Sequence, residues 1–328
     1  MLQALTRRSR LKTIVYFIKF VIGIALIIYL VKTINEHQDI IPILQKVDEK
    51  WIFFAIIIMV PNILLQAWKW WILIRNVKSD LSFWSACGST LGGMSLGILT
   101  PGRIGELGKG LFLDQVEKWQ ITGLALLDRV FNMAAIMIFG LIAYLYILKE
   151  LYLASMFIYI PIALTILILF VFFIYFLLNP EILRAAYNRF EQLHRFKEQT
   201  KLFFSSLRTL KRRTVTQVLL ISCLFQVVVG IQFYMLIVAF EPSLSFAEGL
   251  VGSFSTVLTK AVLPISIADL GIRETAADFF FGLFVNNRAA IFNGSIILFM
   301  INVLFPSILG IFMLPKLSFQ KDLSGPRK

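Results

Sequence analysis

Six segments of this chain are long and apolar enough to cross a lipid bilayer as helices. They occupy residues 13–31, 51–74, 121–148, 151–178, 214–240 and 288–314. A helix of about 20 apolar residues spans the roughly 30 Å of bilayer hydrocarbon. The sequence therefore predicts an all-α, polytopic integral membrane protein.

The composition excludes several other classes of protein. Hydrophobic residues make up 58% of the chain and charged residues only 16%, so the apolar side chains cannot all be buried in one soluble core. Two cysteines and two histidines, far apart, give no disulfide framework, no metal site and no histidine-based triad. We therefore expect no cofactor and no metal.

The net charge of +13 is distributed in a way that indicates membrane orientation and not nucleic-acid binding. Basic residues concentrate before the first span, in the 179–213 loop with nine Lys and Arg, and in the 316–328 tail. The 32–50 loop instead has three lysines and four acids. The positive-inside rule then places both termini and the 179–213 loop in the cytoplasm. Apolar residues recur at helical spacing in that loop, which predicts a basic amphipathic helix on the membrane surface.

Two further apolar regions, 82–118 and 246–286, are interrupted by proline, glycine and charged residues. Since the flanking spans already fix the orientation, each region must enter and leave on the same side, as a re-entrant hairpin. Residues 1–150 and 151–315 then share one plan with opposite orientation, which is an inverted-topology repeat in one membrane domain. Eight simple spans without symmetry are the alternative.

Each interrupted region contains a motif that predicts a tight turn followed by a short helix. In the first, Thr100 can cap a helix that begins at Pro101, with Gly102 and Gly105 permitting the turn. In the second, Pro264 and Gly271 precede a predicted helix over about 270–285. Helix N-termini inside a membrane attract anions.

Ionisable residues at membrane depth cost roughly 2.5–3.5 kcal/mol each, so they must pair or line a wet cavity. The chain places ten of them in or beside its apolar segments: Arg103, Glu106, Lys109, Asp128, Arg129, Lys260, Asp269, Arg273, Glu274 and Asp278. Lys69 is expected to reach the membrane surface along its own helix and to carry no information about function.

We expect the basic side chains near the turns to contact an anion. Arg103 and Arg273 would bind it, with Lys109 and Lys260 in support. Glu106 and Glu274 would orient the arginines, and Asp128 and Arg129 would line or brace the same cavity. The structural alternative is that acid–base pairs, such as Asp128 beside Arg129, only hold the hairpins together.

Four pieces of the sequence resemble one known family, the membrane region of lysylphosphatidylglycerol synthase, which also exists as stand-alone flippase-like proteins. They are Pro101-Gly102-Arg103-Ile104-Gly105-Glu106, Leu126–Asn132, Leu263–Ser266 and Leu270–Glu274. The resemblance covers nearly the whole chain and implies movement of a charged or phosphate-bearing lipid between leaflets. Only a short tail follows the last span, so we do not expect the lipid-aminoacylating activity of the full-length synthase.

The sequence thus predicts a lipid transporter of a bacterial or archaeal plasma membrane, with an anionic lipid as its partner and no nucleic acid. The alternative is a membrane-embedded transferase or hydrolase in which Glu106, Glu274 and Asp128 do acid–base work. A non-transporting scaffold is a third hypothesis, and it predicts no polar cavity between the hairpins. Gly108-Lys109 lacks the spacing of a phosphate-binding loop, so we expect any driving force to be a gradient or the lipid's own concentration difference.

Overall fold

The computed structural model describes residues 47–98, 100, 102–113, 116–150, 210–263, 266 and 269–313, with positions 28, 32, 159–161, 163–168, 171, 175 and 179. All the regular structure in these residues is helical. The predicted spans 13–31 and 151–178, the amphipathic segment 179–213, and the turn residues Pro101 and Pro264 lie wholly or largely outside the described residues.

Four long helices match four of the six predicted spans. They are α3 (Glu49–Ile74), α5 (Lys118–Glu150), α9 (Arg212–Val238) and the continuous run Arg288–Ile311, and each is long and apolar enough to cross a membrane. The last run comprises α12 (Arg288–Phe299), the π-helical turn η2 (Met300–Leu304) and α13 (Phe305–Ile311). Side-chain caps fix two of the starts, because Asp48 accepts from the Lys50 amide and Asn287 from the Ala290 amide.

The two interrupted regions form helical hairpins whose arms are shorter than the spans. The first pairs α4 (Phe83–Ile98) with the 3₁₀ helix η1 (Ile104–Phe112), and the second pairs α10 (Phe246–Val262) with α11 (Ile272–Phe281). Within each hairpin the two arms pack against each other. The second short helix lies within the predicted range 270–285.

The first hairpin differs from the prediction at its turn. The short helix begins at Ile104 and not at Pro101, because Gly102 and Arg103 both adopt left-handed conformations with φ near 55°. Thr100 still acts as a cap, since its hydroxyl accepts a 2.7 Å hydrogen bond from the Gly105 amide. The left-handed residues reverse the chain, which sends η1 back along α4.

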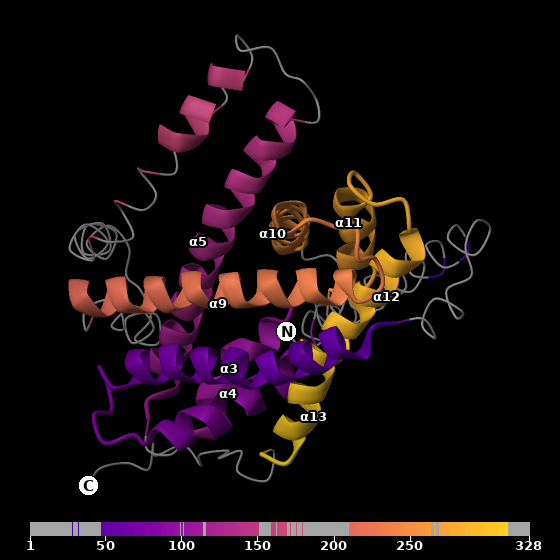
Figure 1. Ribbon diagram of the computed structural model, residues 1–328. Coiled ribbons are helices and arrows are strands. Elements are labelled where there is room, and N and C mark those ends of the chain that lie inside the picture. Colours follow the sequence, from indigo (N-terminus) through magenta and orange to yellow (C-terminus); the bar gives the residue numbers. More distant parts are fainter. Residues whose placement is uncertain are drawn as a thin grey trace, which may run out of the picture.

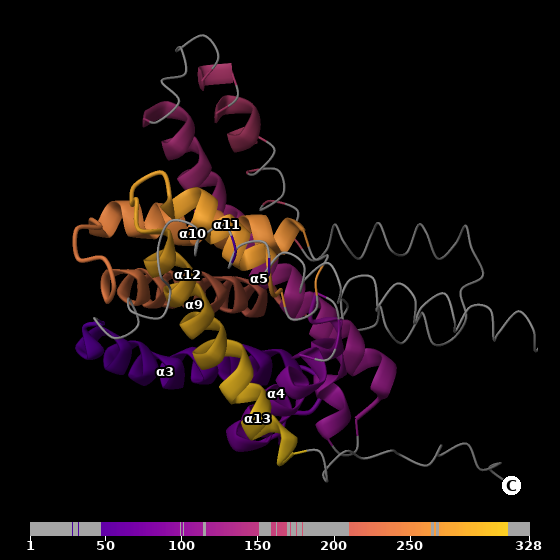
Figure 2. The ribbon, with the colours of Figure 1, turned by 90° about the vertical axis from the view of Figure 1, so that its right-hand side faces the viewer.

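Helices α3 and α9 run antiparallel at the centre of the molecule, one above the other in Figure 1. The Asp48 amide, before α3, donates to the carbonyl of Ala239, after α9. At the opposite ends, Thr214 donates to Asn76. In Figure 2 the α12–α13 run crosses both helices diagonally.

Each hairpin packs on the long helix of the other half of the chain. Helix α10 packs on α5, where Gly140 lies under Leu258, and α4 packs on α13, where Gly310 lies against Leu91. The two hairpin turns also touch, because the Gly102 amide donates to the Ser266 carbonyl at 3.3 Å. The turns that carry the predicted motifs therefore lie together.

Candidate functional site

A polar cavity lies beside the touching turns and has two adjoining lobes of about 160 Å³ each. The charged lobe is lined by Gly102, Arg103, Glu106, Lys109, Asp128, Arg129, Lys260 and Asp269, among others. The amide lobe is lined by Asn62, Gln66, Gln226, Asn302 and Arg273, together with apolar side chains. Both lobes are lined by Arg103, Glu106, Asn132, Ile136 and Lys260, so they lie next to each other.

Arg103 lies at the turn of the first hairpin, with its left-handed backbone directing the side chain to both lobes. Its guanidinium forms an ion pair with Glu106, one turn further along η1. Its Nε atom is buried and has no hydrogen-bond partner in the described part of the chain. Arg103 is thus paired locally with Glu106 and lines both lobes.

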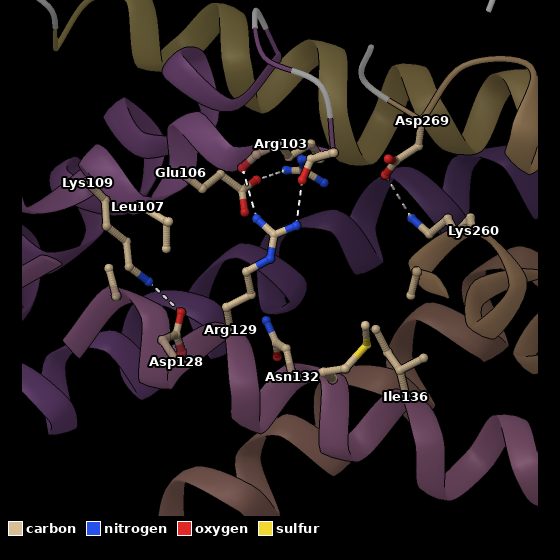
Figure 3. Close-up of a pocket in the computed structure, with 14 residues that line it drawn as sticks. Arg103, Glu106, Leu107, Lys109, Asp128, Arg129, Asn132, Ile136, Lys260 and Asp269 are labelled. Carbon is tan, nitrogen blue, oxygen red and sulfur yellow. Dashed lines mark hydrogen bonds and ion pairs between the residues drawn. The ribbon is translucent and has the colours of Figure 1, made fainter. Parts of the chain in front are cut away.

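Arg129 projects from α5 toward the same turn, as Figure 3 shows, between the Lys109–Asp128 pair and the Lys260–Asp269 pair. It donates to the carbonyls of Gly102, at 2.5 Å, and Arg103, at 3.3 Å. Among the described residues no carboxylate lies within ion-pair distance of it. Arg129 therefore braces the turn and brings an uncompensated positive charge to the charged lobe.

Asp128 is the centre of a buried triad and does not pair with Arg129, so the structural alternative of an Asp128–Arg129 pair is wrong. Its carboxylate binds Lys109 and lies 3.0 Å from the Lys69 ammonium. Lys69 is only 1% exposed and donates to Asn132 at 2.5 Å, so the expectation that it reaches the membrane surface is wrong. Two lysines thus share one carboxylate.

The second turn contributes a longer ion pair. The Lys260 ammonium, in the last turn of α10, lies 3.7 Å from the carboxylate of Asp269. Asp269 has a φ of 62°, so a left-handed residue also shapes this turn. Lys260 lines both lobes, as Arg103 does.

Arg273 and Glu274 form a buried ion pair in the first turn of α11. Arg273 is 2% exposed and Glu274 is 1% exposed. Arg273 binds Glu274 and donates to Ser295 at 3.1 Å, and Glu274 also accepts a 2.6 Å hydrogen bond from the Gly271 amide. Arg273 borders the amide lobe, but these bonds favour the structural interpretation for this pair.

The charges around the cavity do not balance. The described cations that line it or contact its lining are Lys69, Arg103, Lys109, Arg129, Lys260 and Arg273, and the carboxylates are Glu106, Asp128, Asp269 and Glu274. Six basic side chains thus face four acidic ones. An excess of this kind in a low-dielectric site is costly unless an anion compensates it.

The amide cluster is a part of the site that we did not predict from the sequence. Asn62 donates to Gln232 at 3.5 Å and to Asn302 at 3.4 Å, and Asn302 donates to Gln232 at 2.6 Å. Primary amides in the middle of three apolar spans were the available signal, since polar groups at membrane depth are costly.

The π-helical turn that holds Asn302 has a local cause. Pro306, four residues later, has no backbone N–H to donate to the Asn302 carbonyl. Such π-helical turns occur frequently at functional sites.

The described residues contain no cluster of His, Cys, Asp and Glu that could hold a metal ion. A family model described as "Lysylphosphatidylglycerol synthase TM region" matches residues 16–310. No curated protein matches the chain significantly.

Proposed function

The chain belongs to the lysylphosphatidylglycerol synthase TM region family, and from that premise we propose that this membrane protein moves a phosphate-bearing lipid between the two leaflets. The family match and the apolar helices support a lipid-related role in the membrane. Three points go beyond that role and are our proposal. The protein moves the lipid between leaflets, the lipid has an anionic headgroup, and the protein catalyses no reaction.

The observation that carries the proposal is the positive excess of the charged lobe. A phosphate leaving water for a site within the membrane needs compensating charge and several donors. Arg129 offers both, because two of its N–H groups hold the turn carbonyls and the others remain free. An arginine fork suits phosphate oxygens and stays ionised there. Arg103 and Lys260 would complete the contact from the two turns.

The packing of the helices supports an inverted repeat with re-entrant hairpins. In such a repeat α3 corresponds to α9, α4 to α10, and α5 to the α12–α13 run. This correspondence relates the main contacts to one another, because α3 packs on α9, α4 packs on α13 and α10 packs on α5. An antiparallel central pair is what a twofold axis in the membrane plane requires. In this arrangement both turns reach the bilayer midplane, and both termini are cytoplasmic.

The test is transport by purified protein in phosphatidylglycerol vesicles that contain a fluorescent phospholipid in both leaflets. We expect the wild type to exchange the label between leaflets and Arg129→Gln to do so at least tenfold more slowly, with the unfolding temperature measured alongside. Gln is too short to reach both turn carbonyls, so this variant removes the brace as well as the charge. Arg129→Lys, which keeps the charge and loses only the fork, separates the two effects. Arg212→Gln, at an exposed position at the start of α9, is the matched control.

Two results would overturn the proposal. A stable Arg129→Gln protein with wild-type exchange would show that the charged lobe does not handle the phosphate. A new lipid species detected by mass spectrometry after incubation with the wild type would favour the transferase or hydrolase.

A further inference from the structure

Lys69, on α3, is a buried ionisable group that the proposed function does not use. It is 1% exposed and belongs to the buried triad with Asp128 of α5 and Lys109 of η1. Asp128 and Lys109 line the charged lobe, and so does Asn132, to which Lys69 donates. Lys69 thus lies directly behind the wall of this lobe, where it can respond to the charge that the lobe holds.

The two lysines of the triad are held differently. Lys109 donates a hydrogen bond to Oδ2 of Asp128, and its ammonium lies 4.0 Å from the centre of the Trp70 ring. Lys69 lies 3.0 Å from Oδ1 of the same carboxylate, yet this buried oxygen accepts no hydrogen bond among the described residues. The hydrogen bond that Lys69 does donate goes to the amide oxygen of Asn132, and an amine can make it as well as an ammonium. The carboxylate therefore compensates Lys109 more completely than Lys69.

The surroundings of Lys69 supply little further compensation. After Asp128 and Lys109, the next charge that acts on it is Glu106, which is itself paired with Arg103. Helices α4 and η2 contain no charged side chain, and α9 has charged side chains only in its first turn. A second ammonium beside one carboxylate is costly in a low-dielectric site. A buried lysine, unlike an arginine, can remove this cost by releasing its proton.

An anion in the charged lobe would reverse this balance. The negative charge of a phosphate beside Lys109 and Asp128 favours the ammonium form of Lys69. Coupling between two sites is reciprocal, so a proton on Lys69 raises the affinity of the lobe for the phosphate by the same factor. Proton and anion together also carry no net charge through the membrane, which lowers the cost of the crossing.

We propose that the Lys69–Asp128–Lys109 triad binds one proton together with each phosphate-bearing lipid, so that the protein couples lipid movement to a proton gradient. The lone pair of Lys69 Nζ forms the new N–H bond with a proton from water on the side to which the cavity opens. The same proton returns to water on the other side when the lipid leaves. This inference rests on the proposed function and supplies its driving force.

The experiment uses the full-length protein in phosphatidylcholine vesicles that contain a trace of fluorescent phosphatidylglycerol and have a pH gradient across the membrane. Dithionite destroys the label in the outer leaflet only, so the remaining signal gives the final distribution. We expect about tenfold more label on the alkaline side for each pH unit, because one proton moves with each lipid. Without a gradient the label should divide equally, and protein-free vesicles give the background.

A second measurement needs no variant. Wild-type protein in detergent is titrated calorimetrically with short-chain phosphatidylglycerol, at several pH values and in two buffers of different ionisation enthalpy. We expect binding to take up as much as about one proton per lipid. The affinity should therefore rise as the pH falls through the range in which this uptake occurs.

Two substitutions remove the exchangeable proton in opposite ways. Lys69→Met has no proton to bind, and Lys69→Arg keeps a charge that does not leave. Both should lose the accumulation on the alkaline side, because the final distribution depends on the coupling and not on the rate of exchange. Lys50→Met, at an exposed position on the same helix, is the matched control and should accumulate label as wild type does.

The outcomes separate the two proposals. Wild-type exchange that ends with equal label in both leaflets under the gradient, with no proton uptake on binding, would overturn this inference and leave the proposed function standing. Accumulation on the acidic side, or accumulation that survives in Lys69→Met or Lys69→Arg, would overturn it as well. The two wild-type measurements decide the coupling even where a variant does not fold. Failure of wild type to exchange the label at all would overturn the proposed function itself.

Discussion

At the scale of single residues, the three arginines near the turns differ in what surrounds them. Arg129 has no described carboxylate partner and faces the charged lobe, whereas Arg103 is paired with Glu106 and is partly accessible. Arg273 is sealed against Glu274 and Ser295. The pairing of each guanidinium decides whether it is available to an anion, and it ranks Arg129 first.

Replacing Arg273 should mainly lower the free energy of unfolding, and we expect any loss of transport to follow from that. Arg273→Met leaves the Glu274 carboxylate buried without its counter-charge, which costs about 3–5 kcal/mol. We expect a much lower unfolding temperature in detergent. Arg273→Met/Glu274→Gln should recover most of the loss, because the glutamine is neutral and can still accept from the Gly271 amide. A fully stable but inactive Arg273→Met protein would instead support direct contact between Arg273 and the lipid.

At the scale of elements, the position of each hairpin depends on close approach between helices. Gly310 of α13 lies so close to α4 that an added Cβ would be 2.0 Å from the Leu91 carbonyl oxygen. Small residues at such crossings let membrane helices pack without a hydrophobic driving force. The first hairpin, and Arg103 at its turn, are therefore held in place partly by α13.

Gly310→Ala should push α13 away from α4, since the obstructing atom belongs to the backbone and cannot rotate aside. We expect a loss of about 1–3 kcal/mol, measured as a lower unfolding temperature. Gly88→Ala is the matched control at the same interface, because its Cβ would only reach ordinary contact with Met313, at 3.4 Å. Equal tolerance of both changes would contradict the packing argument.

At the scale of the whole molecule, the antiparallel α3–α9 pair and the exchanged hairpins bring both halves of the chain to one cavity. Arg103 and Arg129 come from the first half, and Lys260, Gln226 and Asn302 from the second. A site at such an interface can open alternately to either side when one half moves against the other.

The orientation can be tested without any assay of transport. Reporter fusions after Asn76 and near Arg195 should both read cytoplasmic, and a fusion near Gln38 should read external. The reason is the distribution of Lys and Arg among the loops. An external signal near Arg195 would contradict the predicted orientation of the spans and, with it, the inverted repeat.

The sequence by itself determined the all-helical class and the membrane setting, because long apolar segments have few other stable forms in lipid. It also located four described spans, both hairpin regions and the family. Local patterns could not determine which charges pair: Asp128 lies next to Arg129 in sequence but binds Lys69 and Lys109, which reach it from α3 and η1. The amide lobe likewise forms only when α3, α9 and η2 meet. Ion pairs and cavities depend on distances between segments far apart in the chain, so only the tertiary structure could decide them.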